Sequence, residues 1–319
     1  MRLIHKGYMN KVVFFLLLCK GFFMNAKDPF SFEEINSIEE FELTKPSFLQ
    51  ASDNIKLAYY NFINPNHKEI VVLYPGAGLY GNKTYQWFAK TLNEKYGIGC
   101  YIFDIRGHGN SQGPRGDAPS INRVLLDVAE SVEFIKEKNP NSKIYLTGHS
   151  SGAGLIINYA ANTEKKLENE YIFLAPYLGP KSNTARIHKN ANESFVKSVR
   201  IWVYILGSIF SNSFAKHLKA IFFNYSDTIL KSDPLILPFY TYVMSCVTTP
   251  YEVNLLLKKI DKPVEIYIGE NDEQFLPEKI IAYKNLINTP VHAEIVDNAT
   301  HLSILLNAPK LISEYIRKS

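Results

Sequence analysis

The stretch that decides the fold is Lys143-Ile-Tyr-Leu-Thr-Gly-His-Ser-Ser-Gly-Ala-Gly154. An apolar run with β-branched residues (144–147) leads into Gly148-His-Ser-Ser-Gly152, and a helix-like run follows from Ala153 to Ala161. A strand, Gly-x-Ser-x-Gly and a helix in this order predict a nucleophile elbow, in which the serine lies on a sharp turn. The glycines fit that turn because a Cβ there would clash with the neighbouring elements. Ser150 is therefore the candidate nucleophile; the alternative is a small-residue turn that packs a helix against a sheet.

Composition limits the classes of protein that this chain can belong to. Its 319 residues are enough for one large α/β domain or two modest ones. The net charge of +4 is small and dispersed, so we expect no nucleic-acid partner. With three cysteines the chain predicts no disulfide framework. Because zinc-ligand spacing and phosphate-binding glycine loops are missing from the sequence, we expect neither a metal nor a cofactor.

The N-terminal residues 1–27 form an apolar leader. A short positive region precedes Val-Val-Phe-Phe-Leu-Leu-Leu-Cys19, and Ala26 is a small residue near the end. This arrangement is typical of a signal peptide, while the apolar run is short for a membrane-spanning helix. An exported or membrane-associated protein and a cytoplasmic protein with an apolar leader helix both remain open.

Residues 28–319 show strands and helices in alternation. A hairpin is predicted over 48–62, strands over 69–74, 98–103, 144–147, 171–174, 263–269 and 291–296, and helices over 84–96, 120–138, 153–161, 277–287 and 302–317. This rhythm predicts an α/β fold with a mostly parallel, doubly wound sheet. Ligands of such sheets bind outside the carboxyl ends of the strands, and Ser150 lies at that edge.

The rhythm breaks over residues 179–259, which are largely helical in pattern, rich in aromatic side chains and basic in balance. We interpret this segment as a helical cap inserted over the sheet edge. Its surplus of aromatic area suits an apolar acyl chain or contact with a membrane surface. The alternative is that the aromatic side chains only pack the cap.

A nucleophilic serine needs a base and an acid, which follow an elbow in the order Ser, Asp/Glu, His. His301 and Asp272 each come just after a predicted strand, at the edge that carries Ser150. Glu270 and Glu273 are the rival acids. His108 lies in a glycine- and charge-rich loop, where a structural role is expected.

Stabilising a tetrahedral oxyanion requires hydrogen-bond donors. The loop Pro75-Gly-Ala-Gly78 follows a buried strand, and the residue after the nucleophile heads a helix. We predict the backbone N–H groups of Ala77 and Ser151 as these donors; the alternative for the loop is an ordinary connection.

Taken in order, Pro75-Gly-Ala-Gly78, Asp104-x-Arg-Gly-His-Gly-x-Ser-x-Gly113, Arg115-Gly116, Gly148-His-Ser-Ser-Gly152, Asp272 and His301 resemble the α/β-hydrolase superfamily. The chain is most similar to its group of monoacylglycerol lipases, lysophospholipases and serine aminopeptidase-like hydrolases. It departs from this group at Pro75, where a His is usual, at Leu79-Tyr80, where Glu-His is common, and at Ser151 and Ala153, where Met and Gly are usual. These residues shape the acyl pocket, whereas the donors are backbone groups.

The resemblance implies a serine hydrolase with Ser150 as nucleophile, Asp272 as acid and His301 as base. Its substrate would be a small-molecule or lipid ester, such as a monoacylglycerol or a lysophospholipid. Two alternatives stay open: a serine aminopeptidase-like peptidase, and a catalytically inactive hydrolase fold that binds a ligand.

Overall fold

The computed structural model describes residues 29–30, 33–64, 67–188, 193–209 and 214–318. The predicted leader, residues 1–27, lies outside these ranges. Within the described ranges, no helix combines the length and the apolar character needed to cross a bilayer.

The centre of the molecule is an eight-stranded sheet in the order β1-β2-β4-β3-β5-β6-β10-β11. Its strands are β1 (Ser47–Gln50), β2 (Lys56–Phe62), β3 (Glu69–Tyr74), β4 (Gly99–Phe103), β5 (Lys143–His149), β6 (Glu170–Leu174), β10 (Val264–Gly269) and β11 (Val291–Val296). Six neighbouring strands of this sheet are parallel: β4, β3, β5, β6, β10 and β11. At one edge β1 and β2 pair antiparallel, and β2 is also antiparallel to β4. The predicted mostly parallel sheet is therefore confirmed.

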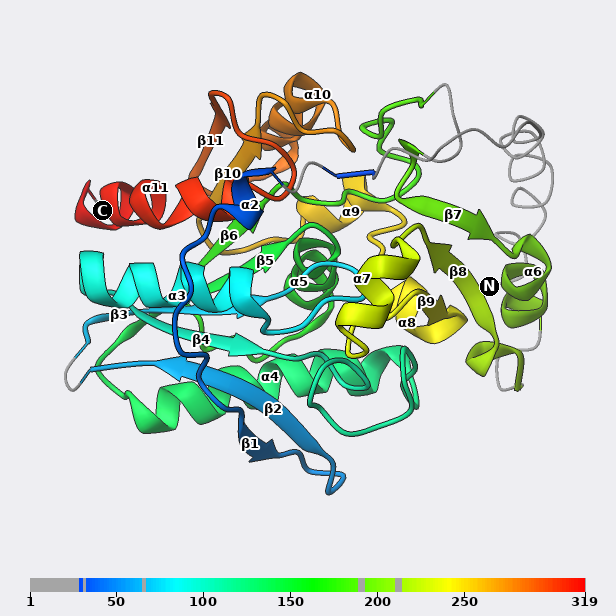
Figure 1. Ribbon diagram of the computed structural model, residues 1–319, viewed down its shortest axis with the longest axis horizontal. Helices are drawn as coiled ribbons and strands as arrows, with labels where there is room; N and C mark the ends of the chain where they lie inside the picture. Colours follow the sequence, from blue (N-terminus) through cyan, green and yellow to red (C-terminus); the bar gives the residue numbers. More distant parts are fainter. Residues whose placement is uncertain (1–28, 31–32, 65–66, 189–192, 210–213, 319) are drawn as a thin grey trace.

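Helices cover both faces of this sheet (Figure 1). On one face, α3 (Lys83–Tyr96) and α11 (Ile304–Lys318) pack against each other and share one apolar core cluster. On the other face, α4 (Ile121–Lys138), α5 (Ser151–Asn162) and α10 (Pro277–Ala282) share a second cluster. Helix α5 is buried along nearly its whole length because it lies between the sheet and the rest of this second layer.

Most predicted elements occur within a few residues of their expected bounds. The β1–β2 hairpin turns at Asn54, whose φ of 66° is the left-handed conformation that asparagine tolerates. The helix predicted over 277–287 is shorter than expected, since the 3₁₀ helix η4 (Tyr283–Leu286) takes over from α10. A short helix, α2 (Glu33–Asn36), precedes the hairpin.

The insertion over residues 179–259 is less helical than its pattern predicts. It contains the helices α6 (Ile201–Ile209), α7 (Asp227–Ser232), α8 (Tyr242–Val247) and α9 (Val253–Leu257), and the 3₁₀ helix η3 (Phe214–His217). It also contains a three-stranded antiparallel sheet of β7 (Val196–Val199), β8 (Lys219–Phe223) and β9 (Phe239–Thr241). The prediction of a helical cap was wrong for these three segments. They are short and rich in β-branched and aromatic residues, and pairing satisfies their backbone N–H and C=O groups.

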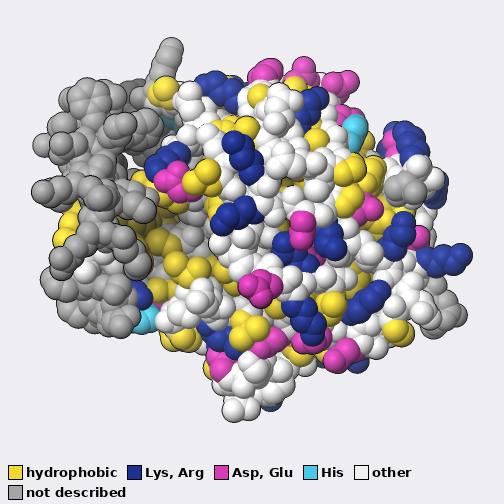
Figure 2. Space-filling model, turned by 180° about the vertical axis from the view of Figure 1, so that it is seen from behind, with side chains coloured by type: hydrophobic (Ala, Val, Ile, Leu, Met, Phe, Trp, Pro, Cys, Tyr) yellow, Lys and Arg dark blue, Asp and Glu magenta, His cyan; other side chains and the backbone are white. Residues whose placement is uncertain are grey.

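The small sheet and its helices lie at one end of the central sheet, at the right of Figure 1. On the face seen in Figure 2, lysine and arginine side chains are interspersed with acidic and apolar ones across the described part of the surface.

Candidate active site

Ser150 lies on the sharp turn that the sequence predicts, between the end of β5 and the start of α5. Its backbone has φ 53° and ψ −117°, which is strained for a residue with a Cβ. A Cβ on Gly148 would lie 2.5 Å from the Cα of Ala153, and a Cβ on Gly152 would lie 2.5 Å from the carbonyl oxygen of Pro75. Both positions therefore require glycine, because backbone atoms of neighbouring elements fill the space.

The structure brings the three predicted residues Ser150, His301 and Asp272 together. Nε2 of His301 is 3.0 Å from Oγ of Ser150, and Nδ1 of His301 is 2.7 Å from Oδ2 of Asp272. The exposed fractions of these residues are 9% for Ser150 and 1% for each of the other two. A neutral imidazole that donates from Nδ1 to a carboxylate presents Nε2 as the acceptor for the serine proton.

Backbone hydrogen bonds hold the carboxylate of Asp272 in place, and the other two candidate acids, Glu270 and Glu273, make different contacts. Its Oδ1 accepts the N–H groups of Gln274 (2.8 Å) and Phe275 (2.7 Å). Glu273 instead accepts the backbone N–H of His301 (2.9 Å), and Glu270 accepts a backbone N–H in an exposed position. Of the three acids, Asp272 is the one that contacts the imidazole ring.

Of the two predicted donor residues, Ser151 adjoins Ser150 in the chain and Ala77 lies in the loop that approaches it. Ser151 follows it in the chain as the first residue of α5, where backbone N–H groups have no acceptor within the helix. Ala77 follows Gly76, and a Cβ on Gly76 would lie 3.5 Å from Cβ of Ser150. The glycine loop after β3 and the N-terminus of α5 thus border the serine side chain.

A buried network behind the site joins the glycine loop, the elbow and the segment that carries His301. The N–H of Gly76 donates to Oη of Tyr85 (2.8 Å), and Tyr85 lies 2.8 Å from Nδ1 of His149. Nε2 of His149 is 3.0 Å from the carbonyl oxygen of His301. Burial lowers the pKa of His149 to about 3, so this ring is neutral at pH 7. It accepts from Tyr85 and donates to the carbonyl.

The insertion contacts the glycine loop directly. Oη of Tyr225 donates to the carbonyl of Ala77 (2.6 Å), and Oη of Tyr240 accepts the N–H of Gly78 (2.7 Å). Tyr240 is also 2.9 Å from Nε2 of His108. Burial lowers the pKa of His108 to about 4, and its neutral ring accepts the Tyr240 proton. His108 therefore positions the loop through Tyr240, which agrees with the structural role expected from the sequence.

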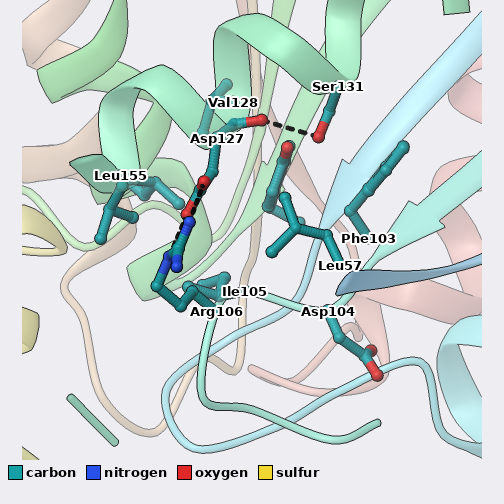
Figure 3. A pocket seen from close by; sticks show the side chains of 11 residues that line it. Leu57, Phe103, Asp104, Ile105, Arg106, Asp127, Val128, Ser131 and Leu155 are labelled. Carbon is teal, nitrogen blue, oxygen red and sulfur yellow. Dashed lines mark hydrogen bonds and ion pairs between the residues drawn. The ribbon is translucent and has the colours of Figure 1, made fainter. Parts of the chain in front are cut away.

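Arg106, from the Asp104-x-Arg-Gly-His stretch, is a buried structural residue. Its guanidinium binds both carboxylate oxygens of Asp127 on α4, at 2.6 and 2.8 Å, and pairs with Asp53 of the hairpin turn at 2.8 Å. Figure 3 shows the Arg106–Asp127 pair, with Ser131 donating to the backbone carbonyl of Asp127. This cluster fixes the loop that carries His108.

Aromatic side chains cover the imidazole of His301. The ring of Phe30 stacks on it with centroids 5.3 Å apart, and Phe275 approaches edge-on at 5.2 Å. Phe195 of the insertion contacts Phe30 at 4.9 Å, and Gln274 donates to the carbonyl of Pro29 (2.6 Å). A segment just after the leader thus contributes to the wall of the site.

Sequence reasoning missed Phe30, Tyr85 and His149 as parts of the site. His149 is inside the elbow motif, which was the one available signal. Tyr85 has the spacing of a core residue of α3, and nothing in the pattern around Phe30 relates it to His301. Within the described ranges, no group of three or more His, Cys, Asp or Glu side chains is arranged to hold a metal ion.

Comparison with known proteins gives one family. A sequence profile described as "Serine aminopeptidase, S33" matches residues 65–305. The chain is 24% identical over 210 residues to a monoglyceride lipase homolog of monkeypox virus, a match that covers 65% of this chain and 71% of the relative. It is 23% identical over 284 residues to a probable lysophospholipase L2 of Haemophilus influenzae, covering 82% of this chain and 86% of the relative.

Two further comparisons give weaker support for an assignment. The chain is 27% identical over 126 residues to the uncharacterized protein YnbC of Escherichia coli, but this match covers 38% of the chain and spans only 21% of that relative's length. A soluble variant of monoglyceride lipase from Saccharomyces cerevisiae, solved with a substrate analog, matches with a TM-score of 0.66. That match covers 92% of this chain and 99% of the other at 18% identity, which is a likeness of fold alone.

Proposed function

Because the chain belongs to the serine aminopeptidase S33 family of α/β hydrolases, we propose that it is a serine hydrolase that cleaves carboxylic esters through an acyl-enzyme. The observation that carries this proposal is the hydrogen-bonded series from Ser150 through His301 to Asp272. A serine on a strained turn, an imidazole within hydrogen-bond distance of it and a buried carboxylate are the parts that nucleophilic attack by a hydroxyl requires.

In the proposed reaction, Oγ of Ser150 attacks the ester carbonyl while Nε2 of His301 takes the hydroxyl proton. Asp272 holds the Nδ1 proton and stabilises the imidazolium that forms. The backbone N–H groups of Ala77 and Ser151 stabilise the oxyanion. The imidazolium then protonates the leaving alcohol, and the same base activates a water that hydrolyses the acyl-enzyme.

We expect a lipid-like monoester as substrate, a monoacylglycerol or a lysophospholipid. In this proposal residues 179–259 are a cap of the single domain 28–319, and its aromatic side chains near His301 surround the acyl chain. Helix α6 on this cap exposes Trp202 and Ile209 (51% and 62%), with Ile205 on the same side. Such an apolar face suits contact with the lipid surface that holds the substrate.

A fluorophosphonate probe tests the reaction class. The probe is expected to label the wild-type protein at Ser150 and to leave Ser150→Ala unlabelled. An unlabelled wild-type protein, together with full esterase activity in Ser150→Ala, would contradict the proposal.

The family name makes peptidase activity the second candidate. Release of N-terminal residues requires acidic side chains for the substrate's ammonium group, and the insertion is basic in balance. Acyl esters and aminoacyl amides compared side by side decide between them, and we expect turnover of the esters. Tight lipid binding without turnover of either would instead identify a ligand-binding protein.

A further inference from the structure

A groove of about 250 Å³ lies on the insertion and is open to solvent, and Ser150 is not among the residues that line it. The side chains of Phe222 and Phe223 on β8 line it, and Lys197 and Arg200 stand at its exposed side. The proposed reaction uses none of these residues.

The two cations of the groove are available to an anion. No ion pair joins Lys197 or Arg200 to a carboxylate among the residues that the structure describes. The guanidinium of Arg200 lies 4.6 Å from the ring centroid of the half-buried Phe222, which orients it while the Arg200 side chain remains exposed. Asp227 is the carboxylate in the lining of the groove, so the groove presents both signs of charge with a positive balance.

The inner wall of the groove is shared with the candidate active site. Phe223 stacks on Phe195 with centroids 4.9 Å apart, and Phe195 in turn contacts the ring that covers His301. Tyr225, which also lines the groove, donates to the carbonyl of Ala77. Tyr225 thus joins the lining of the groove to the loop that borders Ser150.

We propose that this groove binds the head group of a lysophospholipid, with Lys197 and Arg200 on the phosphate and Asp227 facing the ammonium of a zwitterionic head group. This inference rests on the proposed ester hydrolysis and chooses between its two substrates. Arginine and lysine bind phosphate through charge-assisted hydrogen bonds, and the planar guanidinium does so with two donors. A groove that is open and partly charged suits a head group, whereas an acyl chain requires an enclosed apolar channel.

The test compares two esters with the same acyl chain, lysophosphatidylethanolamine and a monoacylglycerol, on the full-length protein. We expect wild type to prefer the lysophospholipid. In Lys197→Ala/Arg200→Ala the ratio of kcat/KM values, lysophospholipid over monoacylglycerol, should fall about 10- to 100-fold, as lost hydrogen bonds to a charged group imply. The fall should come mainly from KM. The matched control is Lys231→Ala/Lys258→Ala, which removes two exposed lysines of the insertion outside the groove and should keep the ratio.

An unchanged ratio in the groove variant, or an equal fall in the control, would overturn the inference. If wild type hydrolyses neither ester, the proposed function fails, and binding to Ser150→Ala tests the groove separately. Lysophosphatidylethanolamine should then bind more tightly than the monoacylglycerol, and the groove substitutions should remove the difference. Equal affinities for the two lipids would overturn the inference. It would also be overturned if inorganic phosphate and glycerophosphoethanolamine displaced the lipid at the same concentration.

Discussion

Replacing Asp272 by asparagine should disable the base without disturbing the fold. The backbone N–H groups of Gln274 and Phe275 both donate to Oδ1, at 2.8 and 2.7 Å, so the asparagine must keep its oxygen there. Its NH₂ group then replaces Oδ2, 2.7 Å from Nδ1 of His301. Because two donors cannot face each other, Nδ1 must become an acceptor and the ring proton must move to Nε2.

The size of the effect follows from the position of that proton. Nε2 lies 3.0 Å from Oγ of Ser150, and once protonated it cannot take the hydroxyl proton. The same wrong tautomer costs a Ser-His-Asp protease about ten-thousandfold in kcat, which corresponds to about 5.5 kcal/mol in the barrier. We expect a loss of this order, with KM for a soluble acyl ester changed much less.

Steady-state hydrolysis of a soluble ester and the rate of fluorophosphonate labelling both measure this loss, since each requires an Nε2 that carries no proton. Glu273→Gln is the matched control: its amide oxygen can still accept the backbone N–H of His301, and it should keep activity within about tenfold of wild type. Thermal unfolding verifies that both variants fold. Near-normal activity of Asp272→Asn, or an equal loss in Glu273→Gln, would refute the assignment of Asp272.

Three further outcomes are expected. Phe30→Ala removes the ring stacked on His301 and should raise the rate of fluorophosphonate labelling several-fold; an unchanged or slower rate would show that this ring does not limit access. Gly152→Ala sets a Cβ against backbone carbonyls, including that of Tyr74, and should cost about 1–3 kcal/mol of unfolding free energy; an unchanged urea midpoint would contradict the overpacking argument. Burial lowers the pKa of His149 from 6.5 to about 3. Below pH 6.5 the His149 imidazole is therefore protonated in the unfolded chain but stays unprotonated in the folded chain. This group should lower the free energy of unfolding by as much as about 1.4 kcal/mol for each pH unit of acidification. In urea unfolding between pH 6.5 and 5, the free energy of unfolding should decrease less steeply for His149→Gln than for wild type. An equal slope in the two proteins would rule out His149 as the source.

The sequence predicts the central sheet and the Ser150–His301–Asp272 arrangement because both depend on local pattern. Parallel strands bring their carboxyl ends to one edge, so residues that directly follow different strands meet there whatever their separation in the chain. The order of serine, acid and histidine then limits the candidates to a few, and the geometry selects Asp272 among three neighbouring acids.

The remaining features depend on tertiary contacts that no local pattern encodes. Tyr85 contacts His149 because of the way α3 lies on the sheet, and its spacing within the helix is that of any core residue. The strands β7, β8 and β9 are only three to five residues long, which is too short for a strand pattern to be told from a helical one. Each strand is stabilised by its neighbours in the small sheet, and those neighbours lie far apart in the sequence.

The hydroxyl of Tyr240 joins the insertion to the loop of Ala77, since it binds His108 on one side and the N–H of Gly78 on the other. Any movement that lifts β9 away from the sheet must break these buried hydrogen bonds and release the loop. Under the proposed mechanism, the position of β9 and the position of the oxyanion donor Ala77 are therefore coupled through one hydroxyl group.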